Sequence, residues 1–234
     1  NSKKFMISIV ALFLVSCATQ NETKMNQYTV GPYDMKIGFG SCLKQNKAMP
    51  IFEAIKADSF DLFLMIGDNV YGDSESEDLR ELRSAYKKQK ENFKNMDLNF
   101  PFEAIWDDHD YGLNDGGKNY AFKEQAKELF LDFWDIPVDD VRRSRQGLYY
   151  DVLKSIDEKD VHIIFLDTRT FRDKLMPTDD RGAPGKERYI PNLDRSLTML
   201  GENQWGWLRK KLSEPSETLK TSLELIASQI IDLQ

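Results

Sequence analysis

The sequence predicts an α/β fold, because three short apolar segments each stop abruptly at residues that can bind metal ions. The segments and the residues that follow them are 36–40 before Cys42, 62–66 before Asp68, and 104–106 before the acidic run 107–110. An apolar run that ends in this way is typical of a buried parallel strand, which presents its ligands at the carboxyl edge of a sheet. We therefore expect three strand ends to converge on one site.

The composition limits the class of protein. The chain has 234 residues, of which 41% are hydrophobic, so it can form one large domain or two small ones with a substantial core. Its net charge of −7 argues against a nucleic-acid-binding surface, since affinity for phosphate backbones depends on clustered Lys and Arg. An acidic protein still binds anionic substrates where a metal ion supplies local positive charge.

Residues 1–16 are predicted to be a lipoprotein signal peptide. A basic start precedes an apolar core that is too short for a membrane span but typical of a secretory signal. Its end, LVS before Cys17, resembles the lipobox of bacterial lipoproteins, in which the cysteine carries the lipid. An ordinary signal peptide with an incidental cysteine is the alternative. Residues 17–30 predict a polar tether, so we expect an exported protein anchored to the membrane of a bacterial envelope through Cys17.

Between residues 36 and 134, strands alternate with helices. A helix at 49–57, with Pro50 at an early position, links the first two strands into a right-handed parallel unit. The acidic stretch 74–78 favours the start of a helix that continues towards Phe93, because carboxylates stabilise the positive end of the helix dipole. The next predicted elements are a strand at 102–106, a glycine-rich loop at 112–118 and a helix at 120–134.

The second half of the chain predicts a further sheet or sheet edge. Residues 147–153 alternate in polarity and residues 161–166 are almost wholly apolar, so the two are expected to be neighbouring strands. Residues 170–194 are charged and contain several prolines and glycines, which predicts a surface excursion near the site. The remaining predicted elements are a helix at 204–212, with Trp205, Leu208 and Leu212 on one face, and a final strand that begins at 223.

Four consecutive residues that can bind metal, Asp107 to Asp110, follow the third strand. Carboxylates this close raise one another's pKa, so such density is costly unless a cation neutralises it. A solvated acidic turn is the alternative interpretation of the cluster by itself. Together with Asp68 and Asp73, which follow another core strand, the cluster favours a metal site built to cleave a phosphoester.

The donor atoms indicate which metals the site would bind. Cys42 is a candidate thiolate ligand, with a buried small hydrophobe and a catalytic nucleophile as alternatives. The nucleophile is excluded, because cysteine phosphatases need an arginine six positions further on and this position is Ala48. A thiolate selects iron or zinc over magnesium, a phenolate from Tyr71 favours ferric iron, and Asp108 suits calcium. We therefore expect a dinuclear or multinuclear site with iron and calcium, with zinc and manganese as alternatives.

Two side chains are candidates for contact with a phosphate group. His109 is predicted either to bind metal or to contact the phosphate and protonate the leaving oxygen. Arg169, just beyond an apolar strand, is predicted to clamp phosphate, with an ion pair to Asp167 or Asp173 as the alternative.

Five stretches of the chain resemble motifs of the alkaline phosphatase D (PhoD-like) branch of the calcineurin-like metallophosphoesterases. They are FGSC (39–42), IGDNVYGD (66–73), WDDHD (106–110), FLDTRTFR (165–172) and LGENQW (200–205). They follow one another in the family's order, which predicts that residues 31–234 are the N-terminal part of such a domain. The resemblance implies a sandwich of two mixed β-sheets flanked by helices, with the metals at strand ends.

The resemblance also implies roles for individual residues. Cys42, Asp68 and Tyr71 are similar to ligands of the first metal, and Asp68 to the bridge between the metals. Asp108 is similar to a ligand of the second metal, where relatives often have asparagine, and His109 to the acid that contacts phosphate. The implied reaction is direct attack of a metal-bound hydroxide on a phosphomonoester or phosphodiester, without a phosphoenzyme.

The chain departs from the family's pattern at its C-terminus. Family members continue past the strand corresponding to residues 223–229 to a motif of glycine, aspartate and histidine that supplies further ligands. We therefore expect a C-terminally truncated fragment that is inactive alone. The alternative to a phosphoester hydrolase is a non-catalytic lipoprotein that binds metal or phosphate, as a truncated or degenerate relative.

Overall fold

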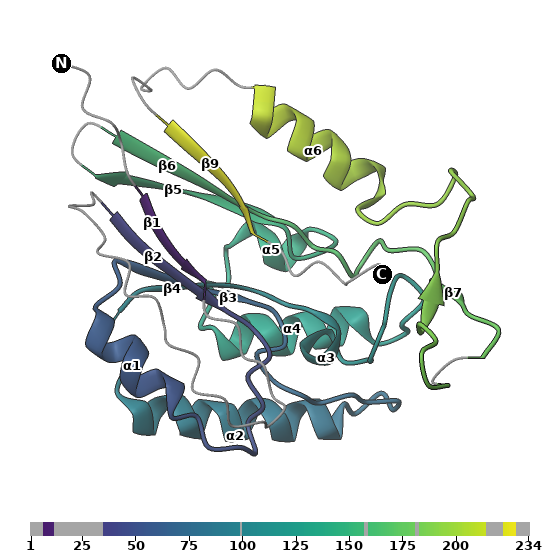
Figure 1. Cartoon of the computed structure of the whole chain (residues 1–234), viewed down its shortest axis with the longest axis horizontal. Helices are drawn as coiled ribbons and strands as arrows, with labels where there is room; N and C mark the ends of the chain where they lie inside the picture. The colour runs from purple at the N-terminus through teal and green to yellow at the C-terminus, as the bar shows by residue number, and fades with distance from the viewer. Residues whose placement is uncertain are drawn as a thin grey trace.

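The computed structural model describes six stretches of the chain, which are residues 7–11, 35–98, 100–156, 159–180, 183–213 and 222–227. In chain order the elements are β1 (Ile7–Ala11), β2 (Met35–Gly40), α1 (Ile51–Asp58), β3 (Leu62–Ile66), α2 (Arg80–Met96), β4 (Phe102–Ile105), α3 (Asp108–Tyr111), α4 (Lys123–Phe133), α5 (Val141–Ser144), β5 (Tyr150–Ile156), β6 (Lys159–Phe165), β7 (Met176–Pro177), β8 (Tyr189–Ile190), α6 (Gly201–Ser213) and β9 (Ser222–Ala227). Two β-sheets share one hydrophobic core, and helices cover their outer sides (Figure 1). The predicted α/β sandwich is confirmed.

The first sheet, called sheet A, contains β1, β2, β3 and β4 in that order, and its described strands are all parallel. The central strand β3 is buried from Leu62 to Met65, as its unbroken apolar run requires. Gly40 is aligned with Met65, and Ile66 with Ile105, so β2, β3 and β4 end together at one edge of the sheet. This edge carries the residues of the candidate site.

The second sheet, called sheet B, contains β5, β6 and β9, with β5 antiparallel and β9 parallel to β6. The side chains of β6 alternate, because Phe165 enters the core shared with sheet A and Ile164 packs with Leu208 of α6 on the other face. The Tyr150 hydroxyl joins the two sheets. It donates to the Ala104 carbonyl at 3.0 Å and accepts from the Ala104 N–H at 3.1 Å.

Helix α6 covers the outer face of sheet B through a narrower contact than the sequence predicts. Leu208 is buried, but Trp205 and Leu212 remain 42% and 44% exposed. The second buried contact is polar, since Gln204 accepts from the Asp167 N–H and donates to the Asp167 carbonyl, both at 2.8 Å. The helix therefore fixes the backbone at the end of β6 as well as covering the sheet.

The described part of the predicted signal peptide is β1, which pairs in parallel with β2 at the edge of sheet A. An apolar segment suits an edge strand as well as a signal peptide, so this pairing does not test the predicted cleavage before Cys17. Cys17 and the other residues of 12–30 lie outside the described residues. Among the described helices, none combines the length and the apolar character needed to cross a bilayer.

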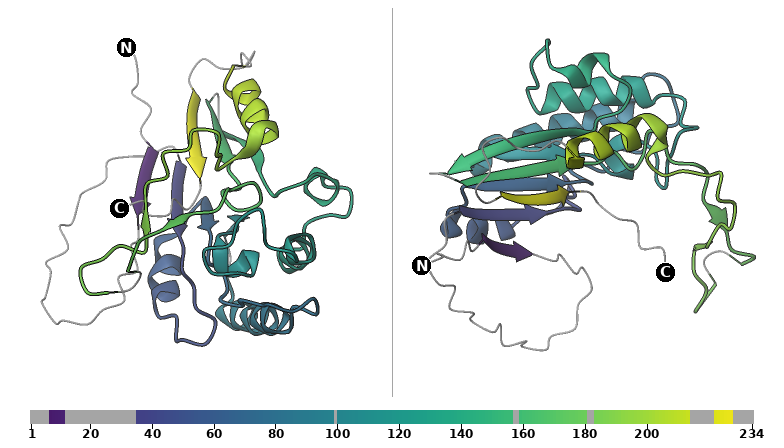
Figure 2. Two further views of the ribbon diagram at one scale, coloured as in Figure 1. Left: turned by 90° about the vertical axis from the view of Figure 1, so that its right-hand side faces the viewer. Right: turned by 90° about the horizontal axis from the view of Figure 1, so that it is seen from above.

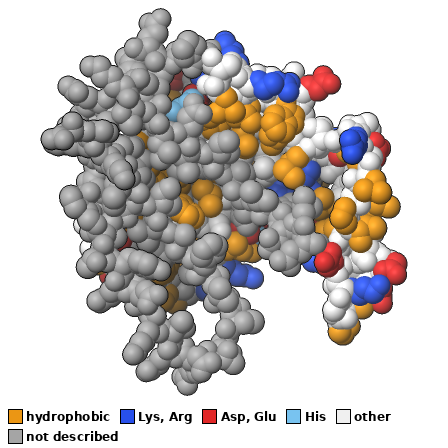
Figure 3. Space-filling model, turned by 45° about the horizontal axis from the view of Figure 1, so that its top comes forward, with side chains coloured by type: hydrophobic (Ala, Val, Ile, Leu, Met, Phe, Trp, Pro, Cys, Tyr) orange, Lys and Arg blue, Asp and Glu red, His pale blue; other side chains and the backbone are white. Residues whose placement is uncertain are grey.

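Residues 173–180 and 183–198 form a projecting arm, where the sequence predicts a surface excursion (Figure 2). Strands β7 and β8 pair antiparallel within the arm. Two hydrogen bonds between Asp173 and Thr198 close its base. The Asp173 N–H donates to the Thr198 carbonyl, and the Thr198 N–H donates to Asp173 Oδ2, both at 2.9 Å. Exposed hydrophobic side chains, including Met176 and Ile190, lie on the arm among charged ones (Figure 3).

Candidate metal centre

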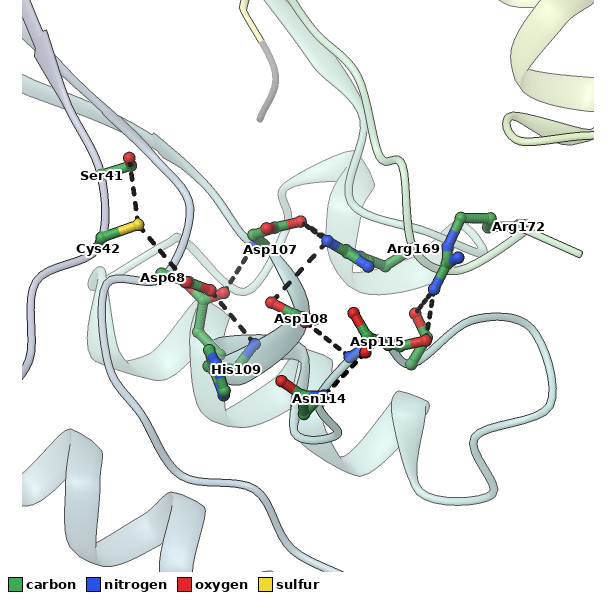
Figure 4. A network of polar contacts seen from close by, with 12 residues as sticks. Ser41, Cys42, Asp68, Asp107, Asp108, His109, Asn114, Asp115, Arg169 and Arg172 are labelled. Carbon is green, nitrogen blue, oxygen red and sulfur yellow. Dashed lines mark hydrogen bonds and ion pairs between the residues drawn. The ribbon is translucent and has the colours of Figure 1, made fainter. Parts of the chain in front are cut away.

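The ends of β2 and β3 bring Cys42 and Asp68 together (Figure 4). Cys42 Sγ lies 3.7 Å from Asp68 Oδ2. Two backbone hydrogen bonds hold the segments side by side, from Cys42 N to the Gly67 carbonyl at 3.2 Å and from Leu43 N to the Asp68 carbonyl at 2.8 Å. Cys42 and Asp68 have φ values of 61° and 51°, in the left-handed region that non-glycine residues rarely occupy outside functional sites and turns. These two strained turns aim both side chains at one point.

Tyr71 joins this pair from the segment after β3. Gln45 holds its backbone, because the Gln45 side-chain amide accepts from Tyr71 N at 2.9 Å and donates to the Tyr71 carbonyl at 2.8 Å. The phenol lies close enough to Asp68 and Cys42 to interact with both electrostatically, and the centroid of its ring lies 4.2 Å from that of the His109 ring. Burial and the charge of Asp68 raise the pKa of Tyr71, so the phenol stays protonated until a cation approaches. The three residues predicted to share the first metal therefore lie together.

The predicted acidic cluster, Asp107 to Asp110, divides between the site and the core. Ligand atoms of Asp68, Asp108 and His109 all lie within 4.8 Å of one another. Asp110 is fully buried and turns away, accepting from Asn69 N at 3.0 Å and from Asn69 Nδ2 at 2.6 Å. Successive residues of the short helix α3 point in different directions, about 100° apart, so the four side chains cannot all face one metal.

Asp73 orients the His109 ring, with its Oδ2 2.7 Å from His109 Nδ1. The His109 backbone N–H donates to Asp68 Oδ1 at 3.3 Å. Burial lowers the pKa of His109, but the hydrogen bond to Asp73 and the charges of Asp68 and Asp108 outweigh it and raise the pKa to about 9. Without a bound cation the ring is therefore an imidazolium at neutral pH, and Nδ1–H donates to Asp73.

We expect Asp73→Asn to lower the pKa of His109 in the metal-free protein by about 1–2 units, because the substitution removes a hydrogen-bonded negative charge. Because folding raises the pKa of His109, its protonation stabilises the fold fully at pH values below 6.5, the ordinary pKa of histidine. This stabilisation is lost as the pH rises through about 9. The variant should therefore lose stability near pH 6.5 and little above pH 9. An NMR titration of the imidazole and thermal melts across this range measure both effects, and an unchanged histidine titration would contradict the assignment.

Arg169 is almost fully buried at the base of the site. Its side chain is 1% exposed and forms an ion pair with Asp107, while Nη2 lies 3.8 Å from Asp108 Oδ1. Burial raises the pKa of Asp107 to about 7, although the charge of Arg169 opposes the rise. Asp167 instead holds the backbone, accepting from the N–H groups of Arg169 and Thr170 at 2.9 Å. The guanidinium thus pairs with a residue other than the two that the sequence suggests, and its contact with phosphate stays a prediction.

A cavity of about 760 Å³ opens over these residues. Its inner end is lined by Asp68, Asp107, Asp108, His109 and Arg169. Its outer wall comes from the arm and the adjoining loops, including Leu175, Met176, Arg188, Tyr189, Ile190 and Leu197. The inner end is therefore acidic with one buried arginine, and the outer wall offers apolar and polar surface to a larger group.

The donor set fits metal ions. Burial and the charge of Asp108 raise the pKa of Asp68 to about 6, which is the electrostatic cost that a cation would remove. The thiol and phenol on one side of Asp68 suit a borderline metal such as iron, and the carboxylate of Asp108 on the other side suits a hard cation. Asp68 lies between the two sets of donors.

The sequence does not predict the partners of several residues around the centre. It marks Asp107 only as one of four consecutive residues that can bind metal, Asp73 only as a nearby carboxylate, and Asp115 only as part of a glycine-rich loop. The turn composition around Asp115, Asn-Asp-Gly-Gly, predicts a loop but no contact. Their partners lie up to 74 residues away, so a local pattern could not have identified them.

Comparisons with known proteins identify the family and the fold of the chain. A family model described as PhoD-like phosphatase matches residues 37–232. A solved structure titled "Structure of PhoD" superimposes with a TM-score of 0.61 at 21% sequence identity, covering 84% of this chain and 42% of that one. The chain therefore spans less than half the length of that relative and shares its fold. No curated protein matches the sequence.

Proposed function

The chain belongs to the PhoD-like phosphatase family, and from this premise we propose that it carries part of the active site of a metal-dependent phosphoester hydrolase. The observation that carries the proposal is the convergence of Asp68, Asp108 and His109, whose ligand atoms lie within 4.8 Å of one another. They come from the ends of two neighbouring parallel strands. Cys42 and Tyr71 contact Asp68 from a third direction, which gives a donor set for two cations.

The metals we propose are iron and calcium. Cys42, Asp68 and Tyr71 would hold the iron, and Asp68 and Asp108 would hold the calcium. When bound, the cations would supply Lewis acidity towards the phosphoryl oxygens and towards an attacking water molecule. His109 would donate a proton from Nε2 to the leaving oxygen, since Nδ1 is committed to Asp73. The Asp73 carboxylate would orient the ring and keep it protonated until that step, since a carboxylate that accepts from one ring N–H fixes the orientation of a histidine.

Arg169 is proposed to affect phosphate binding mainly indirectly, by holding two carboxylates of the site in position. Its ion pair with Asp107 and its approach to Asp108 fix the positions of both acids at the base of the cavity. The Nη1 atom has no hydrogen-bond partner among the described residues and lies buried beside the cavity. A phosphate that reached it would contact a preformed cation without further desolvation.

Metal analysis of the purified full-length protein, together with a panel of phosphomonoesters and phosphodiesters, tests the proposed function. We expect bound iron and calcium and a metal-dependent turnover of at least one class of ester. Turnover that survives removal of all metal would contradict the mechanism. Tight metal or phosphate binding without turnover of any ester would instead support the non-catalytic lipoprotein.

We also propose that the protein is exported and anchored to the bacterial envelope by a lipid on Cys17. This rests on the basic start, the short apolar core and the LVS sequence before Cys17. We expect Cys17→Ser to move the protein from the membrane fraction to the soluble fraction and to abolish labelling by a radioactive fatty acid, because the thiol is the attachment point. Cys42→Ser serves as the matched control and should remain in the membrane fraction. Equal labelling of the Cys17→Ser variant would contradict the anchor.

A further inference from the structure

We propose that Asp115 is a positioning residue that couples the arm over the cavity to the predicted metal ligand Asp108. The inference rests on the proposed function for the role of Asp108. It assigns a role to a loop that the sequence marks only as turn-forming. The contacts of Asp115 run in two directions, inward through its backbone N–H and outward through its side chain and its carbonyl.

The inward contact holds one oxygen of the metal ligand. The Asp115 backbone N–H donates to Asp108 Oδ2 at 2.6 Å, while Arg169 Nη2 lies 3.8 Å from Asp108 Oδ1. The Asp108 carboxylate therefore has a donor on one side and a cation on the other, which fixes its rotation. Groups that orient a metal ligand in this way typically change metal affinity by about 10–100-fold when removed.

The outward contacts belong to the arm. Asp115 Oδ2 accepts from the hydroxyl of Tyr189, the first residue of β8, at 2.7 Å, and it forms an ion pair with Arg188, which directly precedes β8. The Asp115 carbonyl accepts from Arg172 Nη2, close to the base of the arm. Tyr189 and Arg188 also line the cavity, so the residues that hold Asp115 are the ones that form the outer wall.

The loop between these contacts has little freedom to absorb a displacement. Asp115 has a φ of 55°, in the left-handed region, and two glycines follow it. A Cβ at Gly116 would lie 2.6 Å from the Leu113 carbonyl oxygen, and one at Gly117 would lie 2.6 Å from the Arg172 carbonyl oxygen. Because the backbone is packed this closely, releasing the Asp115 side chain should also loosen its amide, and with it the Asp108 carboxylate.

Two substitutions release the coupling without changing Asp108. Tyr189→Phe removes one hydroxyl from the arm. Asp115→Gly removes the side chain but keeps the amide and tolerates the positive φ. The matched control is Asp135→Gly, because Asp135 is exposed, has a φ of 54° and forms an ion pair with Lys90 away from the site.

The experiment measures two quantities on the full-length protein after removal of bound metal. The first is the dissociation constant for Ca²⁺ alone, by calorimetry, and the second is the hydrogen exchange of the Asp115 amide. We expect each of the two release variants to weaken Ca²⁺ binding about 10-fold and to speed exchange at Asp115, with Asp135→Gly unchanged. In the double variant, Tyr189→Phe should cause no further loss of Ca²⁺ affinity beyond that of Asp115→Gly, because both substitutions break the same connection between the arm and Asp115.

Ca²⁺ affinity within twofold of the unmodified protein in both release variants would overturn the proposal, and so would effects that add fully in the double variant. An equal loss in Asp135→Gly would also overturn it, since a general loosening of the fold would then explain the result. If the unmodified protein binds no Ca²⁺, the proposed metal site fails separately. The exchange rate of the Asp115 amide then still decides whether the arm holds this loop.

Discussion

Asp68→Asn in the full-length protein is expected to lower kcat/KM for phosphoesters by at least about 100-fold and to reduce the bound metal. The reason is the position of Asp68 between the thiol of Cys42 and the ligand atoms of Asp108 and His109. An amide lacks the charge and one acceptor oxygen of a carboxylate, so it cannot bridge two cations. Loss of a group that only orients a ligand typically costs about 10–100-fold, which sets the lower limit for a bridging ligand.

The substitution is suited to this position because asparagine, like aspartate, tolerates the left-handed backbone that Asp68 adopts. A fold defect is therefore not expected to explain the loss. Asp97→Asn is the matched control, since Asp97 is exposed, has a φ of 48° and lies before β4, at the edge of sheet A opposite the site. Turnover of a chromogenic phosphoester and metal content are the measurements. Near-normal turnover by Asp68→Asn would remove Asp68 from the centre.

Arg169→Met is expected to destabilise the protein by about 3–5 kcal/mol, because it leaves the buried carboxylate of Asp107 without its cation. In a domain of this size the melting temperature should fall by roughly 10 °C. The pKa of Asp107 is already raised to about 7 by burial, and Arg169 opposes that rise. Without Arg169 the pKa should rise further. When folding raises the pKa of a carboxyl, the folded protein becomes less stable as the pH rises, because the carboxyl then ionises while it is buried. The loss of stability in the variant, relative to the unmodified protein, should therefore be larger at pH 8 than at pH 6.

Two further variants separate this buried pair from a general effect of losing an arginine. Arg169→Met combined with Asp107→Asn should recover part of the stability, because no uncompensated charge remains buried. Arg80→Met is the control, since Arg80 pairs with Asp78 at 3.3 Å on an exposed surface where ion pairs contribute about 0–1 kcal/mol. Thermal and urea unfolding at both pH values provide the measurement. A loss in Arg169→Met no larger than in Arg80→Met would show that the pair is not important for stability.

The strand ends of sheet A show what a local pattern predicts well. Five consecutive apolar residues predict a strand at 62–66, and β3 has those bounds. Parallel strands that neighbour one another end at the same edge, so the proximity of Cys42 and Asp68 followed from the order of the elements. Helix α6 shows the limit. Its apolar spacing places Trp205, Leu208 and Leu212 on one face, but only Leu208 of the three is buried, and the second buried contact is the hydrogen-bonded Gln204.

The sequence by itself determined the strands, the side chains at their ends and hence the kind of ligand that meets at one edge. These properties depend on residues adjacent in the chain, such as an apolar run followed by glycine and aspartate. Only the tertiary structure decided the partner of each charged group, including Asp107 for Arg169 and Tyr189 for Asp115, which lie 62 and 74 residues apart. The physical reason is that such pairs form where elements pack together, and their geometry is set by the packing of the whole core rather than by any local pattern.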